Sequence, residues 1–161
     1  MIVRSLHQRN ALYTLLVITT LFGLGCSGGQ RKAPAGLLPV SGKVTIDGNP
    51  AAFVTMTFTP ERGTNAMGGY AVTDKDGLFK VKHLSNVNNQ EGLEPGTYNI
   101  VFSKLTAPGG APIPEGKTAA DVGAVESLPH HLSTLNQDSP LYSLRVDAAK
   151  TNVELPLKTK R

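Results

Sequence analysis

The chain has 161 residues, enough for one domain with a hydrophobic core and short for two. Its formal net charge of +4 is small and evenly spread, which argues against nucleic acid as a partner. The single cysteine, Cys26, excludes an intramolecular disulfide, so packing alone must hold the fold together. Seventeen glycines and eleven prolines favour a fold with many turns over one built of long helices.

The first 25 residues have the pattern of a secretory signal peptide. Arg4, His7 and Arg9 precede an apolar run that extends from Ala11 to Phe22. A membrane-spanning helix needs about 20 apolar residues, and this run is shorter. The pattern therefore predicts export, and the alternative interpretation is an amphipathic or buried helix.

The motif Gly23-Leu24-Gly25-Cys26 resembles the lipobox of bacterial lipoproteins. In that family a diacylglyceryl group is attached to the cysteine, and the signal peptide is cleaved just before it. The resemblance implies cleavage between Gly25 and Cys26, lipidation of Cys26 and a membrane anchor. Ser27 follows the cysteine where aspartate would retain a lipoprotein at the inner membrane, which implies the outer membrane, facing the periplasm or the cell surface. The alternative is an ordinary signal peptide with an incidental cysteine.

The rest of the chain divides into three parts. Residues 26–38, which include "SGGQRKAPAG", are small and polar and predict a flexible tether after the lipidated cysteine. Residues 39–157 are predicted to form the single globular domain. Residues 158–161, "KTKR", form a short basic tail.

Seven short segments of the domain alternate between apolar and polar residues, which is the period of a β-strand. Their apolar positions, predicted to face the core, are Val40, Gly42, Val44 and Ile46; Val54, Met56 and Phe58; Tyr70 and Val72; Phe79 and Val81; Tyr98, Ile100 and Phe102; Tyr142, Leu144 and Val146; and Val153, Leu155 and Leu157. The turns at 47–50 and 76–77 predict two hairpins, and Pro156 predicts that the last strand lies at a sheet edge. We therefore predict an all-β fold, a seven-stranded antiparallel β-sandwich.

Four segments in order resemble the carboxypeptidase regulatory-like domain, as found in planctomycete-type lipoproteins. They are "VSGKVTIDGNPAAFVTMTFTP", "TDKDGLFKV", "EPGTYNIVFSK" and "YSLRVDAAKTNVELPL", and the resemblance covers Pro39 to Leu157. It implies a transthyretin-like (prealbumin-like) Greek-key sandwich. In metallocarboxypeptidases this module lies beside the enzyme and is not the enzyme, so the resemblance implies no catalytic residue and no cofactor.

Two sets of residues are weak candidates for a metal site. Asp74 and Asp76 flank a turn, but calcium needs six to eight oxygen ligands, and no further acidic cluster lies nearby in the sequence. His130 and His131 are adjacent, which rarely places both rings on one face, and no third ligand is evident. We interpret the aspartates as turn residues and the histidines as solvated loop residues, and predict no metal.

Lys43 and Asn152 are candidates for a covalent bond within the domain. Some similar sandwich domains form a Lys–Asn isopeptide bond, and Lys43 and Asn152 lie in the first and last predicted strands. The alternation points Lys43 away from the core, whereas that reaction needs a buried pair with an acid. No serine lies in a nucleophile-elbow motif, so we predict that the protein is not an enzyme.

The stretch between Phe102 and Tyr142 contains no clear strand and is rich in Pro, Gly, Ala and Ser. By the resemblance, Leu128-Pro129 is expected to pack on the domain. Since variable function tends to lie on loops, Thr106 to Asp138 is predicted to contact a partner, and the alternative is a tolerated insertion.

The sequence thus predicts a non-enzymatic, lipid-anchored module of the cell envelope with a structural or protein-binding role. Its partners would be the membrane and an unidentified envelope protein. The alternative is an accessory subunit that recognises a carbohydrate or peptide for an envelope complex. Contact with a protein is preferred because the nine aromatic residues are mostly assigned to the signal peptide and the core.

Overall fold

The computed structural model describes residues 36–85, 90–136 and 141–160. The predicted signal peptide, the cleavage site at Gly25 and Cys26 and most of the tether lie outside these residues. The described part is all-β, as predicted, with one short helix, α2 (His130–Ser133). No helix within these ranges is long and apolar enough to cross a membrane.

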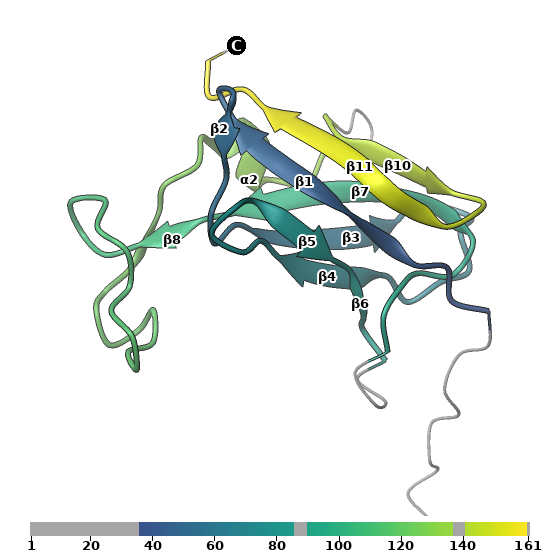
Figure 1. The fold of residues 1–161 in the computed structure, drawn as a ribbon, viewed down its shortest axis with the longest axis horizontal. Helices are drawn as coiled ribbons and strands as arrows, with labels where there is room; N and C mark the ends of the chain where they lie inside the picture. Colours follow the sequence, from purple (N-terminus) through teal and green to yellow (C-terminus); the bar gives the residue numbers. More distant parts are fainter. Residues whose placement is uncertain (1–35, 86–89, 137–140, 161) are drawn as a thin grey trace, which may run out of the picture. The chain divides into compact units, whose positions relative to one another are not determined.

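Two main sheets form the body (Figure 1). The first contains β11 (Lys150–Leu157), β1 (Val40–Ile46) and β2 (Asn49–Pro50), and β5 (Leu78–Lys80) also pairs with β1. The second contains β10 (Ser143–Val146), β7 (Gly96–Ser103), β3 (Thr55–Pro60), β4 (Gly69–Val72) and β6 (Lys82–His83), in that order. A separate two-stranded ribbon pairs β8 (Leu105–Thr106) with β9 (Val125–Glu126).

The two sheets share one hydrophobic core. The first sheet contributes Val40, Val44, Phe79, Leu155 and Leu157, and the second contributes Met56, Phe58, Ala71, Tyr98, Ile100, Phe102 and Val146. Phe58 and Phe79 meet across the sheets with ring centroids 6.4 Å apart. Alternation along each strand turns these side chains inward. The packing of the two inner faces therefore stabilises the fold, since a single cysteine cannot form an intramolecular disulfide.

The two turns predicted from the sequence do not join the strand pairs predicted to form hairpins. After the turn at Asp47-Gly48, β1 pairs with the two-residue strand β2, and the chain then crosses to β3 in the second sheet. The strands β4 and β5, which flank the Asp76-Gly77 turn, also belong to different sheets. Both predicted hairpins are therefore wrong, because turn residues reverse the chain without specifying which sheet it re-enters.

The prediction of a wholly antiparallel fold is wrong for one pair. The strands β1 and β11 run parallel, with Val44 opposite Leu155 and Ile46 opposite Leu157. Their register shifts between Val40 and Gly42, where a Cβ on Gly42 would lie 1.9 Å from the carbonyl oxygen of Val153. The absence of a side chain at Gly42 thus allows the backbones to approach. The strand β11 lies at the edge of its sheet, as Pro156 predicts.

The inward face of β4 also differs from the prediction. Tyr70 and Val72 are exposed, whereas Gly69, Ala71 and Thr73 are buried. A Cβ on Gly69 would lie 2.6 Å from the side chain of Leu93, so this position cannot hold a larger residue. The hydroxyl of Thr73 donates to the carbonyl of Ala51 and accepts the N–H of Val54, which satisfies a polar group inside the core. Because Tyr and Val are more hydrophobic than Gly, Ala and Thr, the alternation of residues predicts that the wrong face of β4 is buried.

The long stretch after β7 is tied to the body at its end. Leu128 and Leu132 belong to the core, so Leu128-Pro129 does lie against the domain, and α2 adjoins β7. Between β8 and β9 the chain makes a succession of turns that project beyond the sheets (Figure 1). We call residues 105–126 the arm.

Candidate functional site

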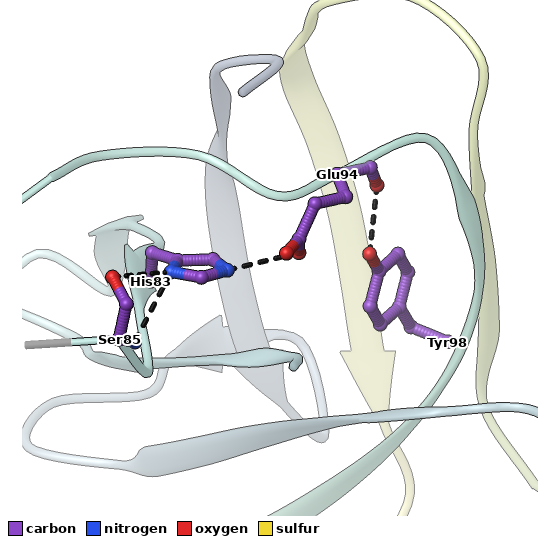
Figure 2. Close-up of polar contacts among 4 residues, drawn as sticks. All are labelled: His83, Ser85, Glu94 and Tyr98. Carbon is purple, nitrogen blue, oxygen red and sulfur yellow. Dashed lines mark hydrogen bonds and ion pairs between the residues drawn. The ribbon is translucent and has the colours of Figure 1, made fainter. Parts of the chain in front are cut away.

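A cluster of polar side chains lies inside the body where β6, the following loop and the start of β7 meet (Figure 2). His83 ends β6 and continues the inward face of Phe79 and Val81, so its ring enters the core. Ser85 follows two residues later, and Glu94 lies just before β7. Figure 2 shows Ser85 and Glu94 approaching the His83 imidazole from opposite sides.

The two ring nitrogens of His83 have different partners. Nδ1 accepts the backbone N–H of Ser85 at 3.1 Å and lies 2.7 Å from its hydroxyl oxygen. Nδ1 must therefore present a lone pair, which places the ring proton on Nε2. Nε2 lies 2.9 Å from Oε2 of Glu94, and among the described residues neither buried atom has another polar partner. The ring is completely buried and the Glu94 side chain is 18 % exposed, so the pair is shielded from solvent.

Tyr98 joins the same cluster from β7. Its hydroxyl donates a 2.7 Å hydrogen bond to the backbone carbonyl of Glu94. Burial, reinforced by the charge of Glu94, raises the pKa of Tyr98 to about 12. A tyrosine at a strand entry that bonds back to the backbone a few residues upstream also occurs as the tyrosine corner of immunoglobulin-type sandwiches.

In a hydrolase triad, a carboxylate orients a histidine, and the histidine takes the proton of a nucleophilic serine. Here, however, Ser85 is buried, and the lone pair of Nδ1 is already engaged by the Ser85 backbone N–H. None of these residues lines the two cavities described below. These contacts instead link the end of β6 to β7 through Glu94. Sequence reasoning did not single out His83, although its phase with Phe79 and Val81 is a signal that could have found it.

A surface groove of about 490 Å³ runs along the outer face of β5, β1 and β11. It brings Lys43 and Asn152, which the sequence suggested as a pair, together with Asp74, which was suggested for a separate reason. Lys43 and Asn152 are both exposed, and the strand register places Lys43 opposite Glu154. The groove therefore lacks the buried setting that an isopeptide bond needs. Its apolar part comes from Val72 and Leu78.

The other candidate ligands have separate surroundings. Asp74 accepts the backbone N–H groups of Asp76 and Leu78, which is a turn-stabilising role. His130 contacts the hydroxyl of Thr134, whereas Nε2 of His131 donates to the carbonyl of Lys158. Both histidines line a second surface cavity beside Tyr142. Within the described ranges, no three His, Cys, Asp or Glu side chains gather as metal ligands would.

Glu126 fixes the base of the arm. One carboxylate oxygen accepts the backbone N–H groups of Lys104 and Leu128, and the other accepts the hydroxyl of Ser103. Partial burial acts to raise the pKa of Glu126, but these hydrogen bonds and one from the Ser127 backbone outweigh it, and the pKa lies below its usual value of 4.5. The hydrogen bonds of the Glu126 carboxylate thus fix the position at which the arm joins the body.

Exposed apolar side chains lie around this origin. Leu105 begins the arm, Val125 lies on its returning strand, and both are exposed. The β3–β7 register pairs Thr55 with Ser103; Phe53 lies two residues before Thr55, and Leu105 lies two residues after Ser103. Phe53 has a positive φ of 57° and is 63 % exposed. A bulky residue in this conformation is strained by about 1–3 kcal/mol, and such strain often marks a functional surface.

A scan against protein-family models, a search of curated proteins and a search of solved structures find no match to this chain. The functional assignment therefore rests on the chain's own residues.

Proposed function

We propose that this protein is an exported, lipid-anchored module of the bacterial cell envelope that binds an envelope protein and has no enzymatic activity. The anchor is proposed from the Gly25-Cys26 motif after a short apolar run. We further propose that the body is a carboxypeptidase regulatory-like sandwich of the transthyretin type. Two sheets around one core and the tyrosine bond at the entry to β7 support this class.

The observation that carries the binding role is the exposed ring of Phe53 in a strained backbone conformation beside the arm. Together with Leu105 and Val125 it forms what we call the arm patch. Aromatic side chains such as that of Phe53 are enriched at protein interfaces, and the neighbouring apolar side chains would add buried area around it. The partner is a protein that presents a complementary apolar surface.

A second candidate function is recognition of a peptide or carbohydrate by the groove beside β11, as an accessory subunit of an envelope complex. The groove mixes apolar walls with the charged side chains of Lys43, Lys80, Asp74 and Glu154. In the described part of the chain, β11 pairs only with β1, so its outer edge could also accept an extended segment.

Crosslinking in intact cells distinguishes the two surfaces. Phe53→Asn removes the ring while keeping a residue that tolerates positive φ, and Leu78→Asn alters the groove. If the arm patch binds the partner, Phe53→Asn reduces the yield of the crosslinked partner and Leu78→Asn does not. Deleting 107–117 should also lower this yield without a large change in melting temperature, because these residues lie outside the core. Unchanged yields for Phe53→Asn and for the deletion contradict the arm patch, and loss with Leu78→Asn alone assigns binding to the groove.

The anchor is tested by replacing the cysteine. Cys26→Ser should move the full-length protein from the membrane fraction to the soluble fraction, because acyl chains contribute about 0.8 kcal/mol per buried methylene. A Cys26→Ser variant that stays in the membrane fraction contradicts the lipid anchor.

A further inference from the structure

We propose that the β4–β6 edge of the second sheet rests on the phospholipid bilayer that holds the anchor, with its apolar side chains in the headgroup region. This inference rests on the proposed lipidation of Cys26. The phospholipid bilayer itself is the binding partner of this surface.

The exposed side chains at this edge have the chemistry of a membrane interface. Tyr70 and Lys82 lie directly opposite each other on β4 and β6. Leu84 continues the same side of β6, and its N–H donates to the carbonyl of Gly68, which follows the exposed Met67. We call Met67, Tyr70, Lys82 and Leu84 the edge patch. Tyrosine is favoured where an apolar medium meets water, and lysine can extend its charge outward while its methylenes lie on apolar surface.

The tether enters the body near this patch. Leu38 exchanges two backbone hydrogen bonds with Leu93, at 2.8 and 3.0 Å. The segment that ends at Leu93 is itself bonded to β6, since Gln90 accepts the N–H of His83 and Glu91 pairs with Lys82. Only about three strand spacings, roughly 15 Å, therefore separate the point where the tether enters from β4.

The length of the tether keeps this end of the body close to the bilayer. Leu38 lies twelve residues after Cys26. Twelve residues span at most about 40 Å even when fully extended, so the anchor would keep the edge patch within reach of the lipid surface. Glu91 is the bridge partner of Lys82, so residues of opposite charge lie at neighbouring positions. The contact is therefore made mainly by the apolar side chains, and it should depend little on salt or on anionic lipid.

A single tryptophan placed in the patch reports the contact. The chain contains no tryptophan, so all tryptophan fluorescence of the variant comes from the introduced indole. Full-length, lipidated Leu84→Trp is reconstituted in phosphatidylcholine vesicles with and without brominated lipid. Leu105→Trp is the matched control, because Leu105 is 45 % exposed and Leu84 is 44 % exposed. Leu105 lies about 20 Å further along the strand direction, six residues beyond Asn99, which is level with Leu84.

We expect brominated lipid to quench Leu84→Trp several-fold more strongly than Leu105→Trp, with emission at shorter wavelength in vesicles and no loss of quenching at high salt. Equal or absent quenching of both variants, in protein that floats with the vesicles, overturns the edge patch and leaves the anchor intact. Protein that does not float with the vesicles overturns the anchor and this inference together. Circular dichroism spectra that match the parent protein verify that both variants are folded.

Discussion

The phenol of Tyr98 donates a 2.7 Å hydrogen bond to the backbone carbonyl of Glu94, and the carboxylate of the same Glu94 lies 2.9 Å from the imidazole of His83. One residue thus links two buried polar side chains, one from each side of the 84–94 loop (Figure 2). Glu94 therefore contacts Tyr98 through its backbone carbonyl and His83 through its carboxylate.

The raised pKa of Tyr98 makes stability depend on pH in the alkaline range. Burial and the charge of Glu94 favour the neutral phenol and raise the pKa from 10 to about 12. Because the folded pKa is the higher one, this contribution to the free energy of unfolding is complete below pH 10 and is lost as the pH rises toward 12. Denaturant unfolding as a function of pH should show the loss. Tyr98→Phe should cost about 1 kcal/mol at neutral pH and reduce the alkaline dependence, and an unreduced dependence contradicts the assignment.

Removing the carboxylate tests the contact with His83. Glu94→Ala leaves Nε2 of His83 buried without a partner, and we expect a loss of about 2 kcal/mol in the free energy of unfolding. Glu94→Gln keeps the shape and should cost about 1 kcal/mol, because a neutral acceptor replaces a charged one. Glu91→Gln, on the exposed side of the same segment, is the control and should change stability by less than about 0.5 kcal/mol. If Glu94→Ala is no more harmful than this control, the contact contributes nothing.

Glu126 should make attachment of the arm sensitive to acid. Its pKa is lowered below 4.5, because hydrogen bonds to the carboxylate outweigh burial. A depressed folded pKa gives a contribution that is complete above 4.5 and is lost as the pH falls through the folded value. Hydrogen exchange of the Lys104 and Leu128 amides, which bond to Glu126, should accelerate relative to the core amides at acid pH. Glu126→Gln should raise this exchange already at neutral pH, and unchanged protection in the variant argues against the clamp.

Gly42→Ala should be among the most damaging small substitutions in the body. The new methyl group would overlap the carbonyl of Val153, and the two paired backbones cannot separate without breaking their ladder. We expect a loss of about 3 kcal/mol in denaturant unfolding. Ser41→Ala on the same strand loses one exposed hydrogen bond to Thr151 and should cost less than about 1 kcal/mol. Similar effects of the two substitutions would mean that the close approach at Gly42 is not required.

The sequence allowed seven strands to be predicted, but not their partners and not the short strands β2, β6, β8 and β9, of which β8 and β9 lie in the stretch predicted to contain no clear strand. Each of the seven alternating segments overlaps an observed strand, because alternation is a local property. The partners depend on contacts between distant residues, and so neither the crossover after Asp47-Gly48 nor the parallel β1–β11 pair was foreseen. The inverted face of β4 depends on its close approach to Leu93, which no neighbouring residue in the sequence reveals.

The candidate sites were predictable to different degrees. Asp74 stabilises the turn, as predicted. Lys43 and Asn152, considered as a pair from the sequence, do line one groove, but neither is buried as an isopeptide bond requires. The buried His83–Glu94 pair was missed, because an isolated histidine and an isolated glutamate carry no motif. The exposed ring of Phe53 was missed because its positive φ is a property of the backbone, and phenylalanine is ordinarily assigned to the core.

The parallel pair of first and last strands also affects when the body can fold. The contact between Ser41 and Thr151 spans 110 residues, so β1 is synthesised long before the strand that completes its sheet. At about 5 to 20 residues per second, β1 has one edge without its final partner for on the order of 5 to 20 s. The first sheet therefore cannot be completed until β11 has been made, and a product that stops before β11 leaves an edge of β1 unpaired. If the protein is exported, as proposed, this delay would favour a chain that is still unfolded when it passes through a translocation pore.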